Sequence, residues 1–236
     1  MTPGGDDETP SAVTGRRRVR LWDWPVRIVH WSFALLLPAL WLSWNAGEMA
    51  LHRWLGYLML GLVVFRLYWG VAGGSTALFR NFVRGPATVM THLRGLPGKQ
   101  TGFVIGHNPL GALSVIALLA LLAAQVLLGL ITQDVDGVES GPLARYVAYD
   151  VAELARYLHG LNFYLMLGVV GLHLCAVAFY FFIKRDNLVG PMLTGHKAVA
   201  DTAPAMTPAP VWRLVIGVAL GAGVAWWVSL GCPLSV

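Results

Sequence analysis

The feature that most constrains this fold is a long apolar segment, about 153–184, that contains two histidines. It is long enough to cross a bilayer as one helix. His159 and His173 are fourteen residues apart, which is nearly four helical turns. Both side chains therefore leave the same side of the helix, roughly 21 Å apart along its axis. Because an imidazole inside a membrane is costly without a partner or a task, this helix is expected to present one nitrogen ligand near each membrane surface.

The composition of the whole chain is that of an integral membrane protein. It has 236 residues, of which 56% are hydrophobic and 12% are charged, whereas a soluble domain has about 25% charged residues. The two cysteines form no Cys-x-x-Cys-His motif, which excludes covalent haem attachment. Apolar segments predict five transmembrane helices, at about 26–44, 51–71, 109–132, 153–184 and 211–230.

The predicted fold class is an all-α membrane helical bundle with three regions. Residues 1–20 are expected to be a disordered N-terminus, because Met1–Gly15 is polar and contains Pro and Gly. Residues 21–190 contain the first four helices and form the core. Residues 191–236 contain a linker, extended over Ala203–Pro210, and the fifth transmembrane helix.

The charged residues of the loops predict the orientation in the membrane. Basic residues gather on the side of the N-terminus: Arg16, Arg17, Arg18, Arg20, Arg27, Arg80, Arg84, Arg94, Lys99, Lys184, Arg185, Lys197 and Arg213. The positive-inside rule then places the N-terminus in the cytoplasm and the C-terminus outside. The net charge of +5 is explained in this way, without a nucleic acid partner. The opposite loops are acidic, with Asp134, Asp136, Glu139, Asp150 and Glu153.

This orientation sorts four histidines into two pairs by depth. His30 and His173 fall in the cytoplasmic half, and His52 and His159 fall near the outer side. A neutral imidazole is a good ligand for haem iron, and two of them on one iron give a b-type haem. The pairs predict two non-covalent haem b groups stacked across the membrane. Glycines near the ligands would let a flat macrocycle approach the backbone: Gly56, Gly168 and Gly171.

Arginines near these histidines are candidates to bind the haem propionates. Arg66 is fourteen residues beyond His52, so it shares that face of the second helix at about the depth of the cytoplasmic haem. A buried arginine needs an anion, which a propionate supplies. Arg27 and Arg53 are further candidates. The alternative is that Arg66 is a snorkelling residue at the surface.

Other interpretations of these residues remain open. A membrane histidine can also form a hydrogen bond between helices. One zinc ion could not use two pairs roughly 21 Å apart, and a proton relay normally uses carboxylates at membrane depth. His92, His107 and His196 are expected to be solvated in loops, and tryptophans at segment ends to be interfacial anchors: Trp22, Trp24, Trp44, Trp54, Trp69 and Trp212. Gly217-x-x-x-Gly221 fits close helix packing.

Six motifs in order resemble a known family over about residues 20–190. They are Arg27-Ile-Val-His30-Trp31, Leu51-His52-x-x-x-Gly56-Tyr57, Phe65-Arg66-Leu67-x-Trp69-Gly70, Phe79-Arg-Asn-Phe82-Val-Arg-Gly85-Pro86, Gly106-His107-Asn108-Pro109-Leu110-Gly111, and His159 with His173. This pattern resembles the bacterial cytochrome b561 family, and most closely the branch with the b-type cytochrome subunit of nickel–iron hydrogenases. The resemblance implies a four-helix di-haem core, quinone reactivity and an electron path across the bacterial inner membrane. It also implies haem ligation by His30, His52, His159 and His173.

These observations predict a cytochrome that transfers electrons between a periplasmic partner and the quinone pool, with quinone oxidoreductase activity. The acidic outer loop favours a basic partner, a c-type cytochrome or an iron–sulfur subunit. Two alternatives are a superoxide-oxidising quinone reductase and a membrane anchor that docks a peripheral enzyme. For each of these functions the chain could form a homo- or hetero-oligomer. The quinone candidates are His107 and Asn108. The competing interpretation is that Asn108 only caps the third helix and that His107 is solvated.

Overall fold

The computed structural model describes residues 16–95, 106–200 and 205–232. Five helices in these ranges are long and apolar enough to cross a membrane: α1 (Trp24–Asn45), α2 (Met49–Ala72), α5 (Pro109–Leu130), α6 (Tyr149–Phe182) and α8 (Val211–Ser229). The prediction of an all-α membrane bundle with five spanning helices is confirmed. The predicted bounds differ from those observed by a few residues, and the largest difference is the earlier start of α6, at Tyr149.

Two helix starts are fixed by the side chains that the sequence indicates. The Asp23 carboxylate caps α1, because its Oδ1 accepts a hydrogen bond of 3.0 Å from the Val26 backbone N–H. The Asn108 side chain caps α5 in the same way, accepting from the Gly111 N–H at 2.7 Å. A proline follows each cap, at a position where its missing N–H costs nothing.

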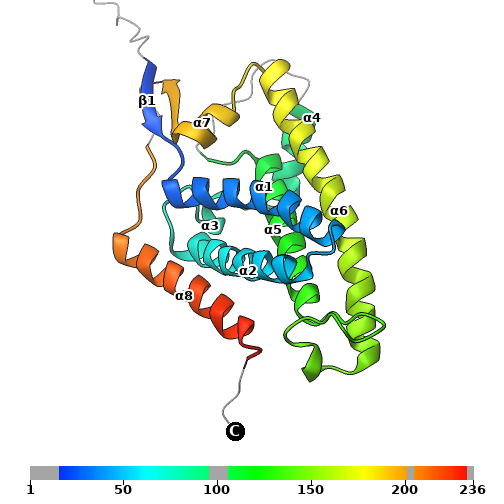
Figure 1. The fold of residues 1–236 in the computed structure, drawn as a ribbon. Helices are drawn as coiled ribbons and strands as arrows, with labels where there is room; N and C mark the ends of the chain where they lie inside the picture. Colours follow the sequence, from blue (N-terminus) through cyan, green and yellow to red (C-terminus); the bar gives the residue numbers. More distant parts are fainter. Residues whose placement is uncertain (1–15, 96–105, 201–204, 233–236) are drawn as a thin grey trace, which may run out of the picture.

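The spanning helices form two antiparallel pairs and a fifth helix (Figure 1). α1 and α2 lie side by side and are joined by a short turn, and α5 and α6 form the second pair. α2 connects the pairs, because it also packs against α5. α8 runs along α2 and makes the most extensive helix contact among the described residues.

Glycines allow the close approach of α8 to α2. A Cβ added to Gly221 would lie 2.5 Å from the carbonyl oxygen of Gly61, and one added to Gly217 would lie 2.8 Å from the Tyr68 ring. The predicted role of Gly217-x-x-x-Gly221 in helix packing is therefore confirmed.

One end of the bundle, here called the basic end, carries the short elements and most of the basic residues. α3 (Phe79–Phe82), α4 (Pro86–Gly95) and α7 (Val189–Thr194) lie there, with strands β1 (Arg16–Arg20) and β2 (His196–Ala200). β1 and β2 pair antiparallel, with Arg18 opposite Ala198. Residues 16–20 are thus ordered, in contrast to the predicted disorder of 1–20. Residues 1–15 and Lys99 lie outside the described residues.

The opposite end, here called the acidic end, is formed by the connection between α5 and α6 and contains Asp134, Asp136 and Glu139. Gln133 and Ser140 form an isolated antiparallel bridge, and a short 3-10 helix follows at Ala144–Tyr146. This connection holds the end of α8, because the Tyr146 hydroxyl donates to the carbonyl of Cys232 at 2.9 Å and Arg145 donates to the carbonyl of Gly231.

A layer of apolar side chains joins four helices between the two ends. Leu36 of α1, Met59 and Val63 of α2, Leu122 of α5 and Met166 of α6 form one buried cluster. These five residues are called the mid-membrane layer below. Along the helices, His52 and His159 lie on the acidic side of this layer, and His30 and His173 lie on its basic side.

Candidate haem sites

The structure brings His52 and His159 together at the acidic end. The centres of their rings lie 6.5 Å apart. A metal–imidazole bond is about 2 Å long, and the bonding nitrogen lies about 1 Å from its ring centre, so two imidazoles on one metal ion have centres roughly 6 Å apart. The observed distance therefore fits two ligands of one iron.

Hydrogen bonds orient both of these rings for metal binding. His52 Nδ1 donates to the carbonyl of Leu40, and His159 Nδ1 donates to the carbonyl of Gln125, each at 2.9 Å. A carbonyl can only accept, so Nδ1 carries the proton and Nε2 retains its lone pair. This is the usual arrangement of a metal-binding histidine, whose second nitrogen is held by a backbone carbonyl or carboxylate.

α5 supplies further support to His159 that the sequence interpretation did not include. The Gln125 side-chain amide donates to His159 Nε2 at 3.1 Å, and its oxygen accepts from Asn162 at 2.6 Å. A metal bond at His159 thus requires the Gln125 amide to turn aside. Gly129 lies against the ring, since an added Cβ would be 3.0 Å from His159 Cε1. A sequence signal existed, because Gln125 is a polar residue within the most apolar of the five helices.

His30 and His173 both lie in the half of the bundle toward the basic end. They are close enough to interact electrostatically, and His173 Nδ1 is hydrogen-bonded to the Ser114 hydroxyl at 3.0 Å. His30 Nδ1 is enclosed and has no hydrogen-bond partner among the described residues. Backbone glycines next to the candidate ligands border open space, because an added Cβ at Gly56, Gly168 or Gly171 would meet no atom within 4 Å.

Arg66 lies buried beside this second pair. Its side chain is 6% exposed, which excludes the snorkelling alternative. The guanidinium lies over the Phe79 ring, 5.1 Å from its centre, and interacts electrostatically with Asp23. Its Nη1 has no hydrogen-bond partner in the described part of the chain. A buried, unpartnered guanidinium nitrogen fits an anionic ligand group such as a carboxylate.

His107 is packed into the same end rather than solvated, so that prediction is wrong. Its ring lies between Trp22 and Phe82, with ring centres 4.6 Å away on each side. Burial, together with the charges of Arg66, His173 and His30, lowers the pKa of His107 to about 3. His107 is therefore neutral at physiological pH. The loop position of His107 gave no signal of this burial.

Four enclosed polar atoms without a described partner gather at the basic end: His30 Nδ1, Arg66 Nη1, Thr76 Oγ1 and His107 Nδ1. Buried polar groups are nearly always hydrogen-bonded, so such a group of exceptions calls for an explanation. A ligand with acceptor oxygens, for example a carboxylate or a quinone, would accept hydrogen bonds from the Arg66 guanidinium, the Thr76 hydroxyl and an imidazole protonated at Nδ1.

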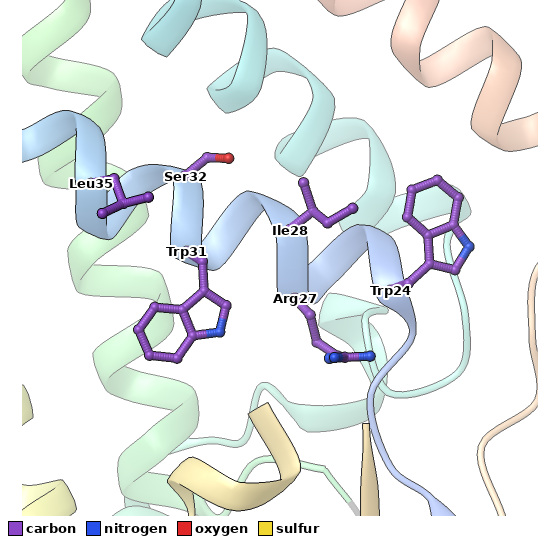
Figure 2. Close-up of a pocket in the computed structure, with 6 residues that line it drawn as sticks. All are labelled: Trp24, Arg27, Ile28, Trp31, Ser32 and Leu35. Atoms are coloured by element: carbon purple, nitrogen blue, oxygen red, sulfur yellow. The ribbon is translucent and has the colours of Figure 1, made fainter. Parts of the chain in front are cut away.

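The remaining predicted residues have partners within the protein. Arg53 pairs with Glu139. The Arg27 guanidinium donates to the carbonyls of Met192 and Leu193 in α7, and it lines an open groove on the outward side of α1 with Trp24, Ile28, Trp31, Ser32 and Leu35. Figure 2 shows Arg27 and Trp31 pointing to the same side of α1, and no histidine lines this groove.

Two of the other side-chain predictions are also wrong. Trp22 and Trp69 are buried and are not interfacial anchors. His92 is half-buried and lies in the short helix α4 rather than in a loop, with its Nε2 3.2 Å from the Tyr180 hydroxyl. The described residues contain no group of three or more His, Cys, Asp or Glu side chains that could hold a metal ion.

A comparison with known families matches the core of this chain. The family model described as prokaryotic cytochrome b561 matches residues 21–195, from just before α1 to the end of α7. The match covers more than half of the chain and leaves α8 outside. No curated protein and no solved structure matches this chain.

Proposed function

We propose that this chain, which belongs to the prokaryotic cytochrome b561 family and is therefore a b-type membrane cytochrome of electron transfer, binds two haem b groups. His52 and His159 would ligate one haem, and His30 and His173 the other. The observation that carries this proposal is the 6.5 Å separation of the His52 and His159 rings, both held with Nε2 free of its proton.

Side chains near His30 and His173 support a haem whose propionate carboxylates point toward the basic end. Arg66 offers a buried guanidinium nitrogen without a partner, and Thr76 offers a buried hydroxyl. The bidentate geometry of arginine suits a carboxylate. Bound haem supplies one-electron chemistry at iron. The protein supplies the ligand nitrogens, an anchor for the carboxylates and the exclusion of water.

The proposed reaction moves electrons across the bacterial inner membrane, between a periplasmic redox partner and the quinone pool. The accumulation of arginines at the basic end supports a cytoplasmic N-terminus. Asp134, Asp136 and Glu139 at the acidic end support a basic partner, such as a c-type cytochrome or an iron–sulfur subunit. The same charges disfavour superoxide, which they would repel.

For the quinone we propose a site at the basic end, next to His107 and Asn108. Support comes from the enclosed and unpartnered His107 Nδ1, which lies close to both candidate ligands of the nearer haem. The Asn108 side chain caps α5 and is also hydrogen-bonded to Tyr180 of α6, which holds it beside His107. A neutral imidazole can exchange a hydrogen bond with a quinone oxygen.

The haem proposal is tested by counting haem and by replacing one ligand at a time. Purified protein should contain two haems per chain and give a reduced-minus-oxidised spectrum of bis-histidine b-type haem. His173→Ala should lose one haem and His52→Ala the other, whereas the control His196→Ala, an exposed histidine of β2, should retain both. Retention of both haems in His173→Ala would show that the pairing is wrong.

The quinone proposal is tested by separating the two roles of Asn108. Asn108→Asp keeps a side chain that caps helices well, whereas Asn108→Ala removes the cap. If the Asn108 amide contacts quinone, both variants should oxidise quinol more slowly at full haem content. If Asn108 serves only as a cap, Asn108→Asp should match the unmodified protein.

A further inference from the structure

Two methionines lie halfway between the two histidine pairs, one on each of two helices. Met166 of α6 is seven residues after His159 and seven before His173. Met59 of α2 is seven residues after His52 and seven before Arg66. Seven residues are nearly two turns and about 10.5 Å of rise, so each methionine shares a helix face with the residues on either side of it.

These methionines are among the most enclosed side chains of the protein. Met166 has no exposed surface and Met59 is 2% exposed. They belong to the mid-membrane layer with Leu36, Val63 and Leu122, so four helices contribute to one apolar cross-section. Phe33 and Phe163 pack against this layer. Thioether side chains adapt to irregular gaps and make favourable contacts with aromatic rings, which suits them to closing such a section.

The layer separates two regions that contain buried or half-buried polar groups. On the acidic side lie Gln125 and Asn162 beside His159. On the basic side lie Ser114 beside His173, and Arg66. Water enters a protein interior where two to four polar partners await it, and apolar spaces stay dry. The five side chains of the mid-membrane layer offer no such partner apart from the weakly accepting sulfur atoms.

We propose that the mid-membrane layer, centred on Met59 and Met166, is a proton seal between the two cofactor sites. Haem bound on both sides would supply one-electron exchange between the two sites, and no bond would form or break in the layer. A proton would need a continuous hydrogen-bonded chain, which the layer interrupts. This inference rests on the proposed function, because it assigns the layer to the path between two haems.

The seal is tested with the haem-loaded full-length chain in phospholipid vesicles. A pH step is imposed without electron donor, and the passive proton influx is followed with an enclosed pH-sensitive dye. The double variant Met59→Gln/Met166→Gln introduces polar amides of similar length into the layer. Its influx should rise several-fold above that of protein-free vesicles, because amides give water the partners that it lacks.

Matched controls separate polarity from packing. Met59→Leu/Met166→Leu keeps the layer apolar at similar volume and should match the unmodified protein. Met90→Gln makes the same chemical change at an exposed methionine of α4 and should also match it. The haem content of every preparation is measured on the same sample.

Two results would overturn the proposal, and the haem content tests the proposed function separately. The proposal is overturned if the double Gln variant retains two haems and its proton influx equals that of protein-free vesicles. It is also overturned if the proton influx through the unmodified protein exceeds that of protein-free vesicles. If the double variant does not assemble, Met166→Ser takes its place, with the same expected rise and the same contrary result. A haem content below two in the unmodified protein would instead contradict the proposed function, while the flux measurement still decides whether the layer seals.

Discussion

The indole nitrogen of Trp69 donates a hydrogen bond of 2.9 Å to the buried carboxylate of Asp23. The other oxygen of that carboxylate caps α1 through Val26. One side chain therefore ties the last turns of α2 to the first turn of α1, close to Arg66 and the proposed haem site at the basic end.

Replacing Trp69 by Phe should destabilise the protein. The ring that stacks on Phe65 is retained in part, but Asp23 loses a buried donor, which costs about 1–3 kcal/mol. The midpoint of thermal unfolding in detergent should fall. The control Trp212→Phe changes an exposed tryptophan of α8 and should leave the midpoint in place. Equal midpoints for all three proteins would show that the bond contributes nothing.

Gly129→Ala should disturb only the haem at the acidic end. The added methyl group would lie 3.0 Å from Cε1 and 3.3 Å from Nδ1 of His159, so the ring must shift away from the Gln125 carbonyl. The midpoint potential or occupancy of one haem should change, and the other haem should keep its values in a redox titration. Gly85→Ala, where an added Cβ meets nothing within 4 Å, is the control. A change in both haems would contradict the assignment.

Gly221→Ala should loosen α8 from α2. Its Cβ would lie 2.5 Å from the Gly61 carbonyl oxygen, which cannot move without shifting a helix. Such overpacking costs about 1–3 kcal/mol. Gly223→Ala, on the same helix but in open space, should be neutral. Thermal unfolding of the two variants compares these costs directly, and the prediction fails if Gly221→Ala is as stable as Gly223→Ala.

The burial of His107 should make the protein less stable in acid. In the folded protein the pKa of His107 is lowered from 6.5 to about 3, so between these values the unfolded chain binds a proton that the folded chain does not. The corresponding stability is present in full above pH 6.5 and is lost as the pH falls toward 3. His107→Gln, which cannot titrate, should lose less stability between pH 7 and pH 5 than the unmodified protein. Parallel losses would show that His107 is not the group responsible.

The proximity of His52 and His159 was predictable because helix geometry converts sequence spacing into depth. His159 and His173 share a face at any realistic helix twist, and alternation of the helices across the membrane then selects their partners. Helix bounds were close for the same reason, since long apolar segments end where polar or capping residues such as Asn108 begin.

What the sequence did not reveal depends on contacts between distant segments. β1 consists mainly of arginines and pairs with residues about 180 positions away, so no local pattern indicates a strand. His107 is enclosed by Trp22 and Phe82 from two other parts of the chain. Arg27 and Arg53 have the charge expected of propionate ligands, but their side chains are directed to α7 and to Glu139 by the tertiary fold.

The glycine contact between α2 and α8 has a consequence for how the protein is made. Residues 73–210 separate the two helices in sequence, so the ribosome must add more than half of the chain after α2 before α8 can dock. During that time Gly61 and its neighbours on α2 face lipid instead of α8. The helix that carries His52 and Arg66 thus obtains the neighbour with which it has its most extensive contact only late in synthesis.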